Sequence, residues 1–418
     1  MMLIYLRFKC NYGGNHTDMP ETKINQLFEK FLKKESLFEN KSVLQSQYVP
    51  EELNHRDEQI GQIASILAPA LKNNKPSNLF VYGKTGTGKT VALKYVSQKL
   101  SEVAKQQEIP LKIIYLNCKL KRVADTEYRL IAQLARMLGR QIPATGLPTD
   151  EVYNTFFELV EKEQANIILV LDEVDQLVNK AGDDIIYNLT RINSDLKNSQ
   201  ITIVGISNDL VFADNLDPRV KSSLSEEEMV FPPYNALQIQ TILKARTEKA
   251  FKQGALGVGV IQKCAAYAAR EHGDARRALE LLRVAAELAE RSEVEQVQLS
   301  HVDHAEEKIE RDRMVEIVRT QPKQFQATLY SVFELRDQPK VHTGDVYEVY
   351  REVCKRINLR PLTQRRISDI IGELDMLGVI NAKLVSKGRH GRTREITLSM
   401  SNSIEPKILD ILKEDLVG

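Results

Sequence analysis

The segment from Gly83 to Thr90 has the residue types and spacing of a phosphate-binding loop. Its order, Gly-Lys-Thr-Gly-Thr-Gly-Lys-Thr, satisfies the pattern G-x-x-x-x-G-K-[ST] in full. The glycines let successive backbone N–H groups point at phosphate oxygens, and a following helix adds the positive end of its dipole. Lys89 can reach the β- and γ-phosphates, and the Thr90 hydroxyl can ligate Mg²⁺. We predict that ATP or ADP is bound by Gly83, Lys84, Thr85, Gly86, Thr87, Gly88, Lys89, Thr90 and Val91.

Polar side chains follow two later apolar runs. Asp172 and Glu173 come directly after the run Ile167–Leu171. At the carboxyl edge of a parallel sheet, Asp172 can hold the water shell of Mg²⁺, and Glu173 can act as the general base for the attacking water. Asn208 follows the second run, where an amide can orient that water; a simple strand-end turn is the alternative for this residue.

Short apolar, β-branched runs alternate with polar or amphipathic segments from Leu79 onward. This alternation predicts a parallel sheet with helices on both faces. Pro232-Pro233 ends the pattern, and the Ala-, Leu- and Glu-rich stretch Ala236–Ser292 predicts a small helical bundle. A charged helical stretch follows through Arg313. The four predicted strands are Leu79–Tyr82, Lys112–Asn117, Ile167–Leu171 and Ile201–Ile206.

The first residues of the chain carry weaker signals. The opening segment Met1–Cys10 is interrupted by Arg7 and Lys9 before a signal-peptide core can form. We expect Met19 to be the true start of the protein. An amphipathic helix is predicted from apolar residues on one helical face, which are Ile24, Leu27, Phe28, Phe31 and Leu32.

A helix, a second helix and a basic hairpin are predicted near the C-terminus, which is the order of a winged-helix domain. Thr363 is a suitable N-cap, and Gly378 closes the recognition helix as its C′ residue. Two strands follow, Val379–Val385 and Thr393–Leu398, with the turn Ser386–Arg392 between them. The buried stripe of the helix is Ile367, Ile370, Ile371, Leu374 and Leu377.

Positive charge is concentrated in this C-terminal part. Residues 355–366 hold five basic residues and no acid, and residues 383–395 hold five more against Glu395 alone. A solvated face normally mixes signs, so we predict DNA binding, with the helix in the major groove and the hairpin along the minor groove. A winged helix used only for protein contacts is the alternative. The predicted DNA contacts are Gln364, Arg365, Arg366, Ser368, Lys387, Arg389, Arg392 and Arg394.

Composition sets broad limits on the rest of the chain. The 418 residues are 42% hydrophobic and 28% charged, with a net charge of +1, as in an ordinary globular protein of two or three domains. The four cysteines form no C-x-x-C pair, which excludes the usual zinc spacings and indicates a reduced compartment. No apolar run approaches the roughly 18 residues of a membrane span. We expect a cytoplasmic, nucleoid-associated protein with no membrane partner.

These motifs together resemble a known family. From about Leu44 to Ser292 the chain is similar to AAA+ ATPases. With the C-terminal module it resembles the archaeal replication initiators, relatives of the eukaryotic origin recognition complex and cell-division-cycle loader. The resemblance is carried by Val49-Pro50 with His55–Ile60, Val81–Thr90, Pro218–Ser223, Gly273–Leu279, and Thr363–Gly378 with Ser386–Glu395.

The resemblance implies an α/β fold, in which a P-loop AAA+ parallel-sheet domain with a helical lid precedes a C-terminal winged-helix domain. The expected divisions are an N-terminal extension and helix over 1–38, the ATPase base over 39–234, the lid over 235–313 and the winged helix over 320–418. An initiator-specific helical insertion that contacts DNA is expected at Lys119–Gly139. Its Lys119, Lys121 and Arg122 are candidate contacts, and ordinary solvated charge is the favoured alternative for each of them.

The resemblance also assigns roles to single residues. Asn208 is the first sensor, and Arg276 is the second sensor, with Arg277 as the alternative. Arg219 is the candidate arginine finger, although the family sets a later arginine where this chain has Ser222-Ser223. The nucleotide is expected to be bordered also by Val49, Pro50, the His55–Ile60 segment, Tyr234 and Arg246, and Tyr48 is either a further contact or a core residue.

The function implied is an ATP-dependent initiator of DNA replication. It binds double-stranded origin repeats, recruits the replicative minichromosome-maintenance helicase, and assembles with itself or paralogous initiators on DNA. ATP hydrolysis acts as a slow switch. Two alternatives stay open: an ATP-sensing transcription regulator, and a helicase- or clamp-loading ATPase without sequence preference.

Overall fold

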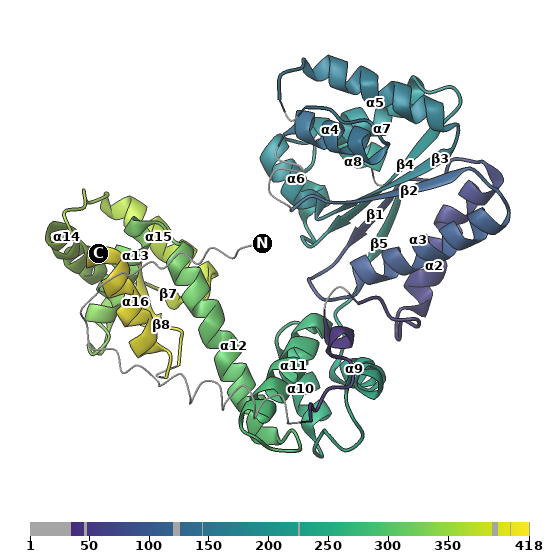
Figure 1. Cartoon of the computed structure of the whole chain (residues 1–418). Coiled ribbons are helices and arrows are strands. Elements are labelled where there is room, and N and C mark those ends of the chain that lie inside the picture. Colours follow the sequence, from purple (N-terminus) through teal and green to yellow (C-terminus); the bar gives the residue numbers. More distant parts are fainter. Residues whose placement is uncertain are drawn as a thin grey trace, which may run out of the picture.

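The computed structural model consists of an α/β domain, a helical lid and a C-terminal domain, which follow one another along the chain (Figure 1). A long helix, α12 (Leu299–Thr320), joins the lid to the C-terminal domain. Within the described part of the chain, no helix is both long enough and apolar enough to cross a membrane. The structure describes residues 35–45, 48–119, 126–143, 145–224, 226–386, 392–401 and 403–417.

The α/β domain is built on one parallel sheet whose strand order is β2-β3-β4-β1-β5. The four predicted strands are present, and three of them extend one residue further at one end or both. β3 lies inside the sheet between β2 and β4 and is buried at all seven positions, as its continuous apolar run requires. The strands are β1 (Leu79–Tyr82), β2 (Leu111–Asn117), β3 (Asn166–Asp172), β4 (Gln200–Ser207) and β5 (Glu227–Val230).

Strand β5 was missed in the sequence prediction. It pairs with β1 at the edge of the sheet, where Met229 is buried and its other three residues are exposed. Because an edge strand with two acidic residues lacks the apolar run that marks a buried strand, its sequence resembles that of a loop.

Helices cover both faces of the sheet. Successive residues of a strand point to opposite faces of the sheet, and each face has its own hydrophobic core. Leu79 and Val81 therefore face α2 and α3, while Phe80 faces α4 to α7. The helices are α2 (Asp57–Leu67), α3 (Lys89–Gln106), α4 (Glu127–Met137), α5 (Thr149–Glu163), α6 (Val174–Ala181), α7 (Asp184–Arg191) and α8 (Pro218–Leu224), with short turns η1 (Lys41–Leu44), η2 (Ala68–Lys72), η3 (Ile192–Ser194) and η4 (Phe212–Asn215).

Helix α4 lies inside the stretch expected to be a DNA-contacting insertion. It begins at the N-cap Thr126 and buries Leu130, Ile131 and Leu134 completely against the core that it shares with α5. Most of this stretch is therefore an integral layer of the domain. Of the candidate contacts, Lys121 and Arg122 lie outside the described residues.

Three helices form the core of the lid: α9 (Ala236–Ala250), α10 (Val260–Arg270) and α11 (Ala275–Arg291). They share a small-residue core rich in alanine and leucine. The segment before the α/β domain also packs here, and the ring of Phe38 stacks on that of Phe251 with centroids 4.9 Å apart. The opening segment, Met19 and the predicted helix over residues 24–32 lie outside the described residues.

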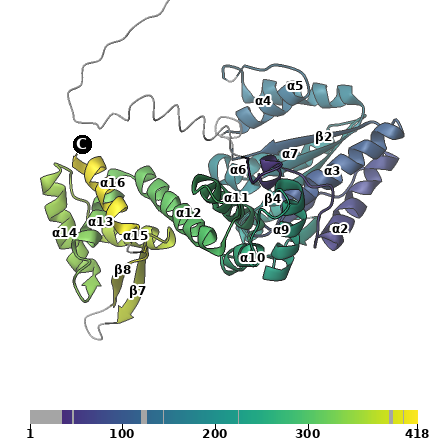
Figure 2. The same ribbon diagram turned by 60° about the horizontal axis from the view of Figure 1, so that its bottom comes forward.

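Helix α12 (Leu299–Thr320) is longer than the stretch predicted to end at Arg313. Its first half belongs to the lid, where Arg277 of α11 pairs with Glu306 at 3.2 Å. Its last turns bury Met314 and Val318 in the core of the C-terminal domain. One continuous helix therefore connects the two parts (Figures 1 and 2).

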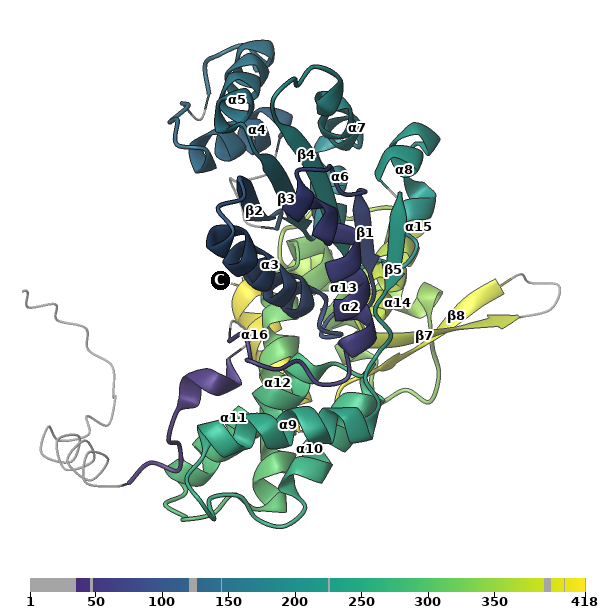
Figure 3. The ribbon, with the colours of Figure 1, turned by 90° about the vertical axis from the view of Figure 1, so that its right-hand side faces the viewer.

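The C-terminal domain has the predicted winged-helix order. Thr363 caps α15 through its side chain, which accepts a hydrogen bond from the Arg366 N–H, and Gly378 has the left-handed conformation expected of a C′ residue. The β7–β8 hairpin projects from the domain (Figure 3). The elements are α13 (Lys323–Glu334), β6 (Val341–His342), α14 (Thr343–Arg356), α15 (Gln364–Met376), β7 (Ile380–Ser386), β8 (Arg392–Leu398) and α16 (Glu405–Val417).

The role of α4 in the core can be tested by substitution. Leu134 is fully buried, so we expect Leu134→Ala to lower the free energy of unfolding by about 2–5 kcal/mol. Met137→Ala on the same helix is the control, because Met137 is 39% exposed, and its cost should stay near about 0.5 kcal/mol. Urea unfolding followed by circular dichroism measures both; equal small losses would contradict a core role for α4.

Candidate nucleotide site and nucleic-acid interface

The phosphate loop lies between β1 and α3, in the strand–loop–helix arrangement that the motif requires. Two of its glycines are needed because of what lies against them. Gly86 has φ +74°, and a Cβ there would lie 1.6 Å from the carboxylate of Asp274. Gly88 has φ +92°, and a Cβ there would lie 2.6 Å from the hydroxyl of Tyr234. Tyr234 belongs to the segment that leads into the lid, and Asp274 belongs to the lid itself.

Arg56 fixes the loop to that segment. Its Nε donates to the carbonyl oxygen of Thr87 at 3.0 Å, and its Nη2 donates to that of Pro232 at 2.5 Å. The guanidinium also lies over the ring of Tyr234, 3.9 Å from the centroid. Burial lowers the pKa of Arg56, but an arginine remains charged at neutral pH. These contacts join the phosphate loop to the start of the lid.

Lys89 and Asn208 meet inside the loop. The Lys89 Nζ donates to the carbonyl oxygens of Gly83 and Lys84, at 2.6 and 2.8 Å, and to Oδ1 of Asn208 at 3.0 Å. Burial, followed by the positive charge of Arg276, lowers the pKa of Lys89 to about 8. The predicted first sensor therefore touches the amine that is expected to bind phosphate.

Asp172 and Thr90 are brought together at the end of β3. The Thr90 hydroxyl donates to Oδ2 of Asp172 at 3.0 Å, and the Tyr115 hydroxyl donates to the same oxygen. A carboxylate beside a hydroxyl is a suitable partial ligand set for Mg²⁺, which keeps several waters and binds nucleotide phosphates. No cluster of three or more protein metal ligands is present among the described residues.

Glu173 stands at the turn after β3. Its backbone has φ +58°, and α6 begins at the next residue. The carboxylate is largely shielded, with 18% of the side chain exposed, and lies 3.8 Å from the Nζ of Lys119. This turn places Glu173 beside Asp172 at the same edge of the sheet as Asn208, which is the arrangement that a general base and a sensor need.

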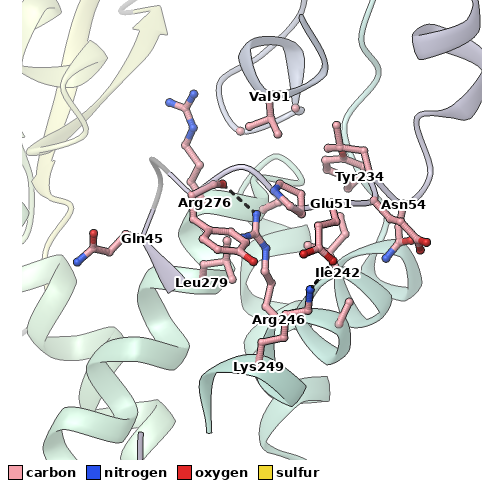
Figure 4. A pocket seen from close by; sticks show the side chains of 18 of the residues that line it. Gln45, Glu51, Asn54, Val91, Tyr234, Ile242, Arg246, Lys249, Arg276 and Leu279 are labelled. Carbon is pink, nitrogen blue, oxygen red and sulfur yellow. Dashed lines mark hydrogen bonds and ion pairs between the residues drawn. The ribbon is translucent and has the colours of Figure 1, made fainter. Parts of the chain in front are cut away.

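A pocket of about 360 Å³ lies between the α/β domain and the lid (Figure 4). Its walls come from the 45–54 segment, the phosphate loop, α9 and α11. Val49 is not among the described residues that line it, whereas the neighbouring Tyr48 is. Of the residues predicted to bind nucleotide or sense it, the pocket is lined by Pro50, Gly86, Gly88, Thr90, Val91, Tyr234, Arg246 and Arg276.

Arg246 builds one wall of this pocket from α9. Its guanidinium donates to the carbonyl oxygens of Val43 and Tyr48, at 3.2 and 3.3 Å, and lies 4.5 Å from the centre of the Tyr48 ring. Burial lowers the pKa of Arg246. Beside it, Lys249 pairs with Glu51 at 3.0 Å (Figure 4). Arg246 therefore fixes the segment that carries Tyr48 to the lid.

The two candidate second sensors have different surroundings. The side chain of Arg277 is 13% exposed and forms ion pairs with Glu271 and Glu306, at 3.1 and 3.2 Å, so its charge is neutralised within the lid. Arg276 is exposed and lines the pocket, and its side chain extends toward the phosphate loop (Figure 4). The geometry therefore favours Arg276 over Arg277 as the nucleotide contact.

Arg219 lies at the start of α8, with 68% of its side chain exposed. Its Nε and Nη2 donate to the two carboxylate oxygens of Asp217, at 3.0 and 3.1 Å. The side chain is therefore engaged by its own loop, and reaching a neighbouring subunit would require that this bond break.

The predicted DNA-contacting residues occupy two kinds of position. Gln364, Arg365 and Arg366 are exposed at the start of α15, and Arg366 pairs with Glu373 at 3.0 Å. Arg394 instead donates from Nη1 to the carbonyl oxygen of Ser368 at 2.6 Å, which braces the hairpin against α15. Lys387, Arg389 and the side chain of Arg392 lie outside the described part of the structure.

Sequence analysis missed three residues that hold the site together, which are Asp175, Tyr115 and Asp274. Asp175 accepts from the Ser207 hydroxyl at 3.0 Å, and thereby ties α6 to the strand that carries Asn208. Tyr115 acts through a tertiary contact for which the sequence has no local signal. Arg56 lies in the His55–Ile60 segment that was expected to border the nucleotide, but its own contacts were not predicted. Asp274 could have been found, because an aspartate directly before an alanine-rich helix is an N-cap signal.

Comparison with known proteins agrees with this geometry. Three family models match the chain in order: an AAA domain over residues 72–210, the Cdc6 AAA+ ATPase-type lid domain over 240–307, and the CDC6 C-terminal winged helix domain over 316–404. The ORC1-type DNA replication protein of Pyrococcus furiosus is 51% identical over 401 residues, which are 94% of each chain. ORC1-type DNA replication protein 1 of Methanosarcina mazei is 51% identical over 92% of this chain and 93% of its own.

Solved structures support the same assignment. The Aeropyrum pernix ORC1 protein in complex with DNA is 44% identical, with a TM-score of 0.81, over 91% of this chain and 98% of its own. CDC6p from Pyrobaculum aerophilum, 24% identical with a TM-score of 0.57 over 91% of this chain and 100% of its own, supports the fold alone. The predicted fold class and the resemblance to archaeal initiators are confirmed. The chain therefore belongs to the family of ORC1-type DNA replication proteins.

Proposed function

We propose that this protein is an ATP-controlled initiator of DNA replication that binds origin DNA and helps to recruit the replicative helicase. One observation carries the proposal: a pocket formed by the phosphate loop and the lid is connected through α12 to a winged-helix domain whose sequence is rich in basic residues over 355–366 and 383–395. The names of its relatives, and the DNA bound to the Aeropyrum pernix ORC1 protein, support it.

The nucleotide lies between the phosphate loop and the lid in this proposal. Lys89 exchanges its carbonyl partners for phosphate oxygens, and Asn208, already within 3.0 Å of the Lys89 amine, orients the attacking water. Glu173 takes the proton of that water as general base. Thr90 and Asp172 would hold Mg²⁺, which supplies charge neutralisation on the phosphates.

ATP hydrolysis switches the lid between two positions relative to the α/β domain. Arg276 extends from α11 into the pocket, so it can contact a γ-phosphate in ATP that ADP lacks. Loss of that contact changes the angle between the α/β domain and the lid. In an assembly on DNA, with itself or a paralogous initiator, Arg219 would serve the nucleotide of a neighbour after release from Asp217.

The winged helix binds double-stranded DNA through α15 and the hairpin. Gln364, Arg365 and Arg366 are exposed on the first turn of α15, where a recognition helix presents side chains to base edges. Lys387, Arg389, Arg392 and Arg394 add positive charge along the hairpin. If six phosphates are contacted, log affinity should fall with log salt with a slope of roughly −5.

The general base can be tested with Glu173→Gln. We expect ATP binding to be retained and hydrolysis to fall by about 10²-fold or more, because the amide cannot accept the proton. Glu163→Gln is the control, since Glu163 lies before the opposite end of β3 and pairs with Lys112. Phosphate release and fluorescent-nucleotide binding give the two readouts. Unchanged hydrolysis in Glu173→Gln would remove Glu173 from the mechanism.

Nucleotide affinity should depend on pH through Lys89. Its pKa is lowered to about 8, so the nucleotide-free protein loses this charge above pH 8, and phosphate binding must restore it. Affinity should therefore fall by about tenfold between pH 7 and pH 9, with proton uptake on binding. Isothermal calorimetry in two buffers measures both, and Lys89→Arg should flatten the dependence because arginine stays charged. Constant wild-type affinity would contradict the assignment.

DNA recognition can be tested by footprinting the DNA that flanks the gene, with ATP, with ADP and without nucleotide. We expect discrete protected repeats, and a loss of about 1–3 kcal/mol in binding for Arg365→Ala. Lys413→Ala is the control, because α16 lies away from the hairpin in Figures 2 and 3.

Helicase recruitment to the protected DNA separates an initiator from a transcription regulator. Uniform, salt-sensitive protection with no preferred site would instead indicate a loading ATPase without sequence preference.

A further inference from the structure

Asp274 is the residue before α11, and its carboxylate caps that helix. Oδ1 accepts from the backbone N–H of Arg276 at 2.7 Å and from that of Arg277 at 3.3 Å. These N–H groups have no partner within the helix, so the cap determines where the first turn begins. The capped turn carries Arg276, the residue that the proposed function assigns to nucleotide sensing.

The same carboxylate lies directly on the phosphate loop. A Cβ on Gly86 would be 1.6 Å from Oδ1 of Asp274, so only glycine permits this approach. Next to it, the Ala275 N–H donates to the carbonyl oxygen of Gly86 at 3.2 Å. The N-terminus of α11 is therefore attached to the loop by a side-chain contact and a backbone hydrogen bond.

The turn before Asp274 is fixed as well. Gly273 has φ +70°, and a Cβ there would lie 2.4 Å from the carbonyl oxygen of Tyr234. The Tyr234 N–H donates to the carbonyl oxygen of Gly273 at 3.3 Å. Since Tyr234 also stacks on Arg56, the start of α11 is held both by the loop and by the segment that Arg56 binds.

We propose that Asp274 is a positioning residue for nucleotide sensing, because it sets the start of α11 against Gly86 and so fixes Arg276 relative to the phosphates. The inference rests on the proposed role of Arg276 and deepens it. The carboxylate also offsets the positive end of the α11 dipole beside the loop. In this proposal Asp274 holds the first turn of α11 in place, and the Arg276 side chain distinguishes ATP from ADP.

A simple stabilising cap is the rival explanation, and the lid contains a matched control for it. Asn235 caps α9, where its side chain accepts from the Gln238 N–H at 2.9 Å, and the Gln238 side chain accepts from the Asn235 N–H at 3.0 Å. Both capping bonds stay within residues 235–238. Asn235→Ala and Asp274→Ala each remove one N-cap from the lid, but only Asp274→Ala also removes a contact with the phosphate loop.

The test measures the ratio of ATP to ADP affinity with fluorescent nucleotides on the full chain. Asp274→Ala should reduce this ratio to within about twofold of the ratio measured for Arg276→Ala. The double variant should show no further loss, because Asp274 acts on the nucleotide only through Arg276. Asn235→Ala should keep the wild-type ratio. Asp274→Asn, which retains an acceptor oxygen for the cap, should also keep it.

Asp274→Glu covers the case in which Asp274→Ala fails to fold. The longer side chain keeps the charge, but its extra methylene has no room above Gly86, so the ratio should fall here too. A wild-type ratio in Asp274→Ala or Asp274→Glu, with a reduced ratio in Arg276→Ala, would overturn the positioning role alone. A wild-type ratio in Arg276→Ala would overturn the sensing role in the proposed function and this inference with it.

Discussion

The buried guanidinium of Arg56 is the contact on which the arrangement of the site depends. It joins a carbonyl oxygen of the phosphate loop to one in the segment leading to the lid, and it stacks on Tyr234. Because burying a charge is costly unless it is hydrogen-bonded, these partners must stay in place. Arg56 therefore ties the phosphate loop to the segment that leads from the sheet into the lid.

Parallel strand register explains why residues distant in sequence meet beside the loop. Asp172 pairs with Ile206 in the neighbouring strand, and Tyr82 pairs with Ser207. The phosphate loop, the acidic pair and Asn208 therefore leave the sheet at one edge. In an open α/β sheet this carboxyl edge is where ligands bind, and here the lid covers it.

The parts predicted from sequence were those encoded by local signals. The buried strands have continuous apolar runs, the phosphate loop has a fixed spacing, and Thr363 and Gly378 mark the two ends of α15. The edge strand β5, the full length of α12 and the burial of α4 depend on tertiary packing, which no short window contains. The contacts of Arg56 were not predicted for the same reason, because its partners lie 31 and 176 residues away. The functional roles of the site residues stay predictions.

The continuity of α12 has a mechanical consequence. Its 22 residues form a rod of about 33 Å, at 1.5 Å per residue. The helix is held to the first turn of α11 at Glu306, its eighth residue, through the pair with Arg277, and its far end is embedded in the core of the C-terminal domain. The 14 residues beyond Glu306 span about 21 Å, so a tilt of about 10° at this point would move the far end by about 4 Å, close to one base-pair step of about 3.4 Å. Any change in the angle of the lid would therefore be transmitted along one continuous helix to the C-terminal domain.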